Sequence, residues 1–122
     1  MKVGVNVAVN SDTGDIGAFA KRAEDLGFQS LWMAEHPIIP VQTTSKYGGT
    51  PDGSIPPSMS DMADPFVCLA IASATTSEIM LGTSICLVPE HNPLVQAKQI
   101  AALDFHSGGR FIFGIGTGWL RE

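Results

Sequence analysis

The sequence predicts an α/β fold built from parallel βα repeats. Short apolar segments of strand character alternate with helix-like segments, and the strand segments lack the strict polar alternation of a half-exposed sheet. Strands of this kind, separated by helices, are typical of a parallel sheet that is buried on both faces. A chain of 122 residues, 44% of them hydrophobic, is long enough to bury a sizeable core in one domain.

The first repeat combines a strand near residues 3–9 with a helix from about Asp15 to Leu26. Apolar side chains recur on one face of this helix at helical spacing. Gly27 is a suitable stop for it, because glycine adopts the left-handed conformation without a Cβ penalty. The second strand is expected at residues 30–34.

The two later helices begin with the same chemistry. Asp64-Pro65 and Asn92-Pro93 each place a side-chain acceptor at the cap and a proline at the first helical position. We expect these helices to run to about Ser73 and to about His106.

The third and fourth strands are expected at Ile79 to Val88, which is almost continuously apolar, and at Arg110–Ile115. Right-handed crossovers would place every loop that follows a strand at one end of the sheet. In α/β proteins that end carries the ligand site. The long loop 35–63, rich in Pro, Gly, Ser and Thr, is expected there as a mobile lid; the alternative is a passive insertion.

Composition limits the possible partners. A net charge of -5, with seven unclustered Lys and Arg, gives no support for nucleic-acid binding, and no apolar run has the length of a membrane span. The N-terminus lacks a signal-peptide pattern. We expect Cys68 and Cys86 to be reduced thiols of a cytoplasmic protein, although the sequence leaves a disulfide open.

One histidine stands out by position. His36 directly follows the second expected strand, so its imidazole would lie at the ligand end of the sheet. There it could donate, accept or orient a proton. The alternative is a loop histidine that only caps or packs.

Two groups of small residues are open to a ligand interpretation. Gly82–Ser84, inside the third strand, indicate a bulge or the close approach of a ligand; the alternative is tight packing against a helix. Gly114–Gly118 has the spacing G-x-G-x-G after a late strand, which is a weak dinucleotide signal. It fits better a loop whose backbone lies against a flat ligand.

A metal site is the less favoured interpretation. Glu35-His36 and Glu90-His91 each follow a strand, so the two pairs could converge, and such ligands suit zinc. No third strong ligand is evident in the sequence, and we expect no metal.

Together these segments resemble the bacterial luciferase-like monooxygenase superfamily, most closely its coenzyme F420-dependent oxidoreductase branch. The resemblance covers almost the whole chain in the order and spacing of the family. It rests on the segments 26–32, Glu35-His36, Asp64-Pro65, Leu81–Thr83 through Val88-Pro89, Asn92–Leu94 with Ala97-Lys98, and Ser107–Arg110 through 118–122.

The resemblance implies a TIM-type (β/α)8 barrel that binds a flavin or deazaflavin at the C-terminal ends of its strands. His36 matches the family's histidine beside the reactive face of the ring, which makes it the candidate catalytic residue. A non-prolyl cis peptide is expected at Ser84–Ile85, against the ring. The resemblance implies that the cofactor-binding residues are Ser84, Ile85, Cys86, Gly116, Thr117 and Gly118.

The implied activity is hydride transfer between F420 and a small organic substrate. An FMN-dependent monooxygenase and a non-catalytic α/β fragment are the alternatives. A complete barrel of this type needs roughly 250 residues. We therefore expect residues 1–122 to be one luciferase-like domain, the N-terminal half of a barrel truncated after the fourth strand, completed by a missing C-terminal half or by a homo-oligomer. The sequence does not identify the substrate.

Overall fold

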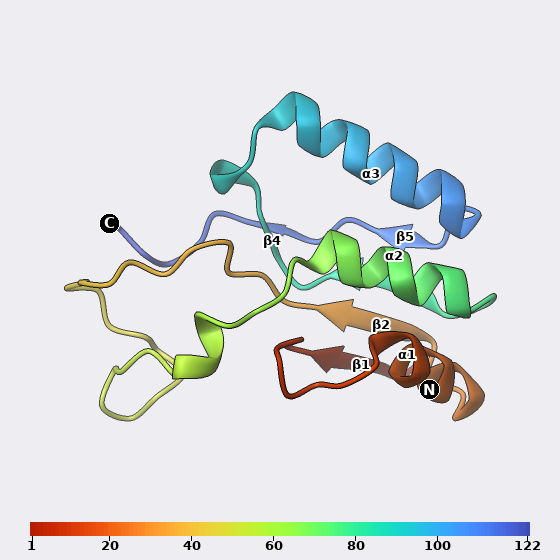
Figure 1. The fold of residues 1–122 in the computed structure, drawn as a ribbon, viewed down its shortest axis with the longest axis horizontal. Coiled ribbons are helices and arrows are strands. Elements are labelled where there is room, and N and C mark those ends of the chain that lie inside the picture. The colour runs from red at the N-terminus through yellow and green to blue at the C-terminus, as the bar shows by residue number, and fades with distance from the viewer.

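The computed structural model describes residues 1–122 and contains six short strands in two parallel sheets (Figure 1). The larger sheet has the strand order β1-β2-β3-β5, and the smaller one pairs β4 with β6. All pairings are parallel, so the loops that follow the strands gather at one end, as predicted. The strands are β1 (Gly4–Val7), β2 (Ser30–Met33), β3 (Met80–Thr83), β4 (Cys86–Leu87), β5 (Phe111–Ile112) and β6 (Ile115–Gly116).

Three α-helices connect the strands, and each begins where its sequence predicts. The side chain directly before each helix accepts hydrogen bonds from backbone N–H groups of the first turn, which satisfies donors that have no partner within the helix. The helices are α1 (Ile16–Asp25, capped by Asp15), α2 (Pro65–Thr75, capped by Asp64) and α3 (Pro93–Ser107, capped by Asn92). Two 3-10 turns, η1 (Pro57–Met59) and η2 (Val88–Glu90), lie in the connecting loops.

The hydrophobic core lies between the larger sheet and the helices. α2 packs against α1 on one side and α3 on the other. Burial was predicted for both faces of the sheet, but this chain covers only one. The opposite face carries the exposed Asn6 and the half-buried Trp32. Side chains without solvent exposure in the core include Leu31, Leu81, Ala20, Leu69 and Ala72.

The predicted third strand, Ile79 to Val88, is not continuous. β3 ends at Thr83, a cis peptide bond joins Ser84 to Ile85, and β4 follows; Val88 already belongs to η2. Leu81 and Cys86 are five positions apart, whereas their partners on the neighbouring strand, Phe111 and Ile115, are four apart. One extra residue on one strand of a pair defines a β-bulge, and the expected cis bond and bulge are thus confirmed.

The fourth strand is interrupted at the same level. The prediction of one strand over Arg110–Ile115 was wrong, because Phe113 and Gly114 separate β5 from β6. The Thr83 hydroxyl donates to the Gly114 carbonyl at 2.8 Å and accepts from the Gly114 N–H at 3.0 Å. A Cβ atom at Gly114 would overlap the Thr83 carbonyl oxygen. A side chain therefore bridges the strands where the backbone ladder is broken.

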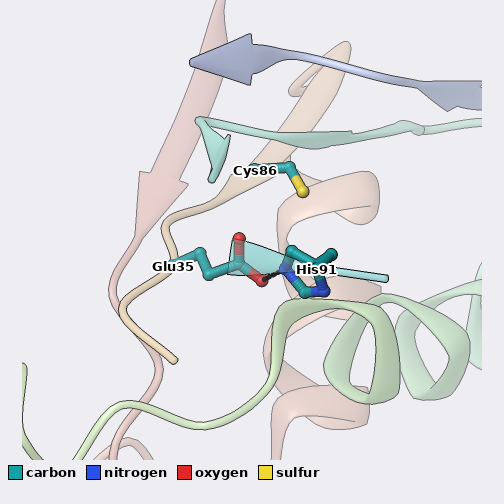
Figure 2. A group of neighbouring side chains, drawn as sticks. All are labelled: Glu35, Cys86 and His91. Atoms are coloured by element: carbon teal, nitrogen blue, oxygen red, sulfur yellow. Dashed lines mark hydrogen bonds and ion pairs between the residues drawn. The ribbon is translucent and has the colours of Figure 1, made fainter. Parts of the chain in front are cut away.

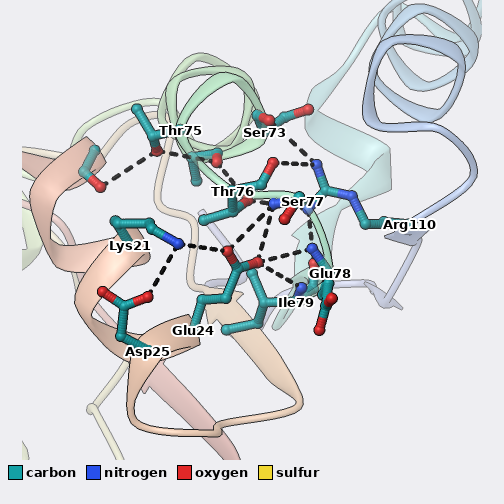
Figure 3. Close-up of polar contacts among 12 residues, drawn as sticks. Lys21, Glu24, Asp25, Ser73, Thr75, Thr76, Ser77, Glu78, Ile79 and Arg110 are labelled. Atoms are coloured by element: carbon teal, nitrogen blue, oxygen red, sulfur yellow. Dashed lines mark hydrogen bonds and ion pairs between the residues drawn. The ribbon is translucent and has the colours of Figure 1, made fainter.

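At the opposite end of the strands, a polar clamp holds the turn 76–79 between α2 and β3 (Figure 3). Arg110 donates to the carbonyl oxygens of Ile79, Thr76 and Ser73 at 2.8, 3.1 and 3.1 Å. It also donates to the carbonyl oxygen of Ser107 at 2.8 Å. The guanidinium thus satisfies carbonyl groups from α2, α3 and the turn at once.

Glu24 of α1 completes this clamp from the other side. Its Oε2 atom accepts from the N–H groups of Ser77, Glu78 and Ile79 at 3.0, 2.8 and 3.0 Å. Although burial acts to raise the pKa of Glu24, these N–H donors lower it to about 2. The carboxylate is therefore ionised throughout the neutral range.

None of the helices combines the length and apolar character needed to cross a membrane.

Candidate active site

His36 lies beyond the C-terminal end of β2, as predicted, and is half-buried. Its ring meets the ring of Trp119 edge to face, with 6.3 Å between centroids. Tyr47, from the loop 35–63, packs against the same Trp119 ring, with 5.3 Å between the two ring centroids. The loop 35–63 and the segment after β6, far apart in the sequence, thus bring three rings together.

The loop 35–63 is tied to the end of the chain. The Glu122 carboxylate accepts hydrogen bonds from the backbone and hydroxyl groups of Thr44 and Ser45. This contact holds Tyr47 beside Trp119. The loop is therefore held against the segment that follows β6, and its role as a mobile lid stays a prediction.

The cis bulge places Ser84 and Ile85 at the same end of the sheet as His36. The Ser84 N–H donates to the Met33 carbonyl at 2.7 Å, which ties the bulge to the end of β2. Ile85 keeps 41% of its surface exposed. Both residues are therefore accessible to a ligand from the side of the sheet that the helices leave open.

The remaining predicted cofactor residues divide into two kinds. Thr117 and Gly118 are exposed. Gly116 is covered by Ile85, since a Cβ atom there would overlap the isoleucine side chain. Cys86 has no exposed surface, so its side chain points into the core and only its backbone could lie near a ligand.

Cys86 belongs instead to a buried cluster with Glu35 and His91 (Figure 2). The Glu35 carboxylate is 5% exposed and accepts from the Leu87 N–H at 2.6 Å, while its other oxygen lies 2.9 Å from His91 Nε2. The carboxylate thus ties the end of β2 to the segment that follows the bulge. It fixes the backbone on which His36 and the bulge are carried.

The cluster partly realises the predicted convergence of the two Glu-His pairs. Glu35 meets His91, and Cys86 adds a third ligand type, with all three ligand atoms within 4.8 Å of one another. Burial, and then the negative charge of Glu35, raise the pKa of the Cys86 thiol to about 12. Because Glu35 and His91 already satisfy one another and the Gln96 amide donates to the Cys86 sulfur at 2.8 Å, the arrangement favours a structural role.

Sequence reasoning missed two of the aromatic residues at the site. Trp119 and Tyr47 are each a single aromatic residue in a glycine-rich or polar stretch, and no periodicity marks them. The indole Nε1 atom of Trp119 is buried and has no hydrogen-bond partner. An unpaired buried donor costs about 1–3 kcal/mol, so it is an expected point of contact for a ligand.

A model of the luciferase-like monooxygenase family matches residues 1–122. The chain belongs to this family. An uncharacterised protein of Mycobacterium tuberculosis is 43% identical over 115 residues, covering 93% of this chain and 41% of that protein. The F420-dependent glucose-6-phosphate dehydrogenase of Kineococcus radiotolerans is 36% identical over 107 residues, covering 86% of this chain and 27% of the dehydrogenase.

The solved structures confirm the fold class. The monooxygenase RslO1 of Streptomyces bottropensis superimposes with a TM-score of 0.72 at 27% identity, covering 99% of this chain and 34% of that one. The repeats of this chain thus have the fold of part of a TIM-type barrel, and they span less than half the length of these relatives. Related enzymes are oxidoreductases or monooxygenases, and they include an F420-dependent dehydrogenase and a monooxygenase in complex with FMN.

Proposed function

We propose that this chain forms part of an F420-dependent oxidoreductase that transfers a hydride between the deazaflavin and a small organic substrate. The observation that supports the proposal is that His36 follows β2 while the cis bulge is bonded to the Met33 carbonyl at the end of the same strand, so both lie at the ligand end of the sheet. The 36% identity to an F420-dependent dehydrogenase supports this cofactor.

The accessible residues fit one face of a flat ring. Ile85 offers an exposed apolar side chain that lies over Gly116 of the neighbouring strand. Apolar surface with a few placed polar groups is the usual lining of a cofactor site. Ser84 and Ile85 would support the ring, with Thr117 and Gly118 at its edge and Cys86 contributing only backbone.

F420, when bound, supplies the hydride chemistry at its ring. His36 is placed to hold or move the proton that accompanies this transfer, because its imidazole takes part in no hydrogen bond or ion pair of the chain. Trp119 and Tyr47 would exclude water from that imidazole. Glu35 keeps the backbone of His36 in place through Leu87 and His91.

An FMN-dependent monooxygenase is the second candidate. It is favoured by the similarity to the monooxygenase RslO1, at 27% identity and a TM-score of 0.72. The apolar contacts of Ile85 would serve either ring, so binding has to be measured for each cofactor separately. A fragment without catalytic activity is the third outcome.

Titration of F420 and FMN against the chain, followed by cofactor fluorescence, tests the proposal. We expect F420 to bind at least about tenfold more tightly than FMN, which corresponds to about 1.4 kcal/mol. His36→Ala should change this affinity by less than about threefold and lower turnover by roughly 10²–10⁴ once a substrate is identified. Tighter binding of FMN would favour the monooxygenase, and binding of neither cofactor would contradict both.

A further inference from the structure

A polar cavity of about 340 Å³ lies between the loop 35–63 and the segment that follows β6. It is separate from the bulge and from the buried cluster of Glu35. Its lining consists of Thr44, Ser45, Lys46, Trp119 and Arg121. Hydroxyl groups, two cationic side chains and an indole therefore face one space.

Four donors of two consecutive residues converge at this cavity on a carboxylate. Oε1 of Glu122 accepts from the N–H and hydroxyl of Thr44 at 2.6 and 2.9 Å and from the Ser45 N–H at 2.9 Å. Oε2 accepts from the Ser45 hydroxyl at 2.7 Å. The Ser45 hydroxyl, followed by these N–H groups, lowers the pKa of Glu122. The segment already binds an oxyanion supplied by the chain itself.

Two cationic side chains near this carboxylate have no ion-pair partner. Lys46 and Arg121 both line the cavity, yet neither forms an ion pair with any carboxylate of the chain. Asp52 lines an adjoining pocket with Lys46 but does not pair with it. Donors, cations and free volume together make a place for a second negative charge.

Trp119 adds an independent observation. Its Nε1 atom is buried and has no acceptor, and the residue is part of the cavity wall. The Nε1 atom has no exposed surface, so the indole serves the cavity as a wall, and a ligand oxygen would reach the unpaired donor only after the ring turns. The backbone donors of Thr44 and Ser45 are fixed in direction, so they can exchange one oxyanion for another without rearrangement.

We propose that this cavity is a subsite for an anionic group, a phosphate or carboxylate of a ligand, which displaces the Glu122 side chain from Thr44 and Ser45. Lys46 and Arg121 would neutralise the ligand. The anion could belong to the substrate or to the side chain of the cofactor. The proposal goes beyond the proposed function and does not require F420 binding.

The test is a titration of the chain with inorganic phosphate at constant ionic strength, followed by the amide NMR signals of Thr44 and Ser45. We expect these two signals to shift in the wild-type chain, and Glu122→Gln to bind phosphate about tenfold more tightly because the competing charge is gone. Lys46→Gln, which keeps Glu122 in place, should weaken binding about three- to tenfold. Lys98→Gln, on the exposed face of α3, is the matched control and should bind as the wild type does.

Two results would overturn the subsite. One is phosphate shifts that lie away from Thr44 and Ser45; the other is equal affinity of the wild type and Lys46→Gln. FMN and riboflavin, which differ by a phosphate, distinguish the sources. If the anion is the cofactor's, Lys46→Gln weakens FMN and spares riboflavin; if it is the substrate's, both are unaffected while phosphate is weakened. Loss of F420 binding with phosphate binding intact would contradict only the proposed function.

Discussion

The two ends of the strands use polar side chains in opposite ways. At the end that carries the turn 76–79, Arg110 and Glu24 bond almost entirely to backbone groups, and few donors or acceptors are left over (Figure 3). At the other end, His36 and the Trp119 indole have no hydrogen-bond partner in the chain. At the first end nearly every polar side chain has its hydrogen-bond partners, whereas at the second end some polar side chains have none.

The difference separates stability from chemistry. In βα barrels, the end at which the strands begin holds the fold together, whereas the end at which they finish carries the reactions. Glu35 is the exception in this chain, because it lies at the reactive end and is saturated by Leu87 and His91. Substitutions at the two ends should therefore differ in what they damage.

The largest loss of stability is expected for Arg110→Met. The methionine keeps an aliphatic stem but removes the donors to the carbonyl groups of Ser73, Thr76 and Ile79. We expect the free energy of unfolding to fall by about 3–4 kcal/mol, measured by urea denaturation. Arg22→Met, at an exposed position of α1, is the control and should stay within about 0.5 kcal/mol.

A somewhat smaller loss is expected for Glu35→Gln. The amide offers one oxygen in place of two, and its NH2 group can face His91 Nε2 only in the tautomer in which that nitrogen accepts, so the hydrogen bonds to a charged carboxylate are lost. Unfolding should become easier by about 2–3 kcal/mol. Glu90→Gln, an exposed neighbour of His91, is the matched control. Equal stability of the two variants would mean that the hydrogen bonds of Glu35 do not stabilise the fold.

Glu24→Gln sharpens the comparison through pH. Because the folded-state pKa of Glu24 is lowered from 4.5 to about 2, its stabilising effect is fully present above about pH 5 and is lost as the pH falls toward 2. Allowing for solvent screening, we expect a difference of about 1–2 kcal/mol from the wild type at pH 7. Denaturation series at pH 7, 4 and 3 should show this difference shrinking. A constant difference would contradict the ionised clamp.

The smallest effect on stability is expected for His36→Ala. The imidazole contributes one edge-to-face contact with Trp119 and no hydrogen bond, so the free energy of unfolding should fall by only about 0.5–1 kcal/mol. Thermal unfolding of the two proteins measures this. A change as large as that of Arg110→Met would place His36 in the scaffold and remove the contrast between the ends.

Local chemistry explains what could be predicted from the sequence. Asp64-Pro65 and Asn92-Pro93 mark helix starts with an acceptor and a preset backbone angle, and α2 and α3 begin there. The bulge at Ser84–Ile85 was also placed correctly, but by resemblance to a family. Apolar character alone predicted one unbroken strand, because it carries no trace of the bond between Thr83 and Gly114.

Long-range polar contacts could not be predicted. Arg110 and Glu24 look like ordinary surface charges in the sequence, since their partners are backbone groups that only the fold brings near. The meeting of Glu35 with His91 was half anticipated from the positions of two Glu-His pairs. Cys86 was expected beside a ligand, but its side chain points into the core. Resemblance to a family places the residue next to the bulge and does not say to which face its side chain points.

The Thr83 hydroxyl, bonded to both the carbonyl and the N–H of Gly114, marks the boundary between the two sheets. Below it, β3 and β5 keep one register; above it, β4 and β6 keep another. The segments that carry Ile85 and Thr117 therefore pair in a register that differs by one residue from that of the strands beneath them. In a family whose members bind different ligands on one scaffold, the strand ends beyond this change of register are where the ligand-binding segments can differ while the strands beneath them are kept.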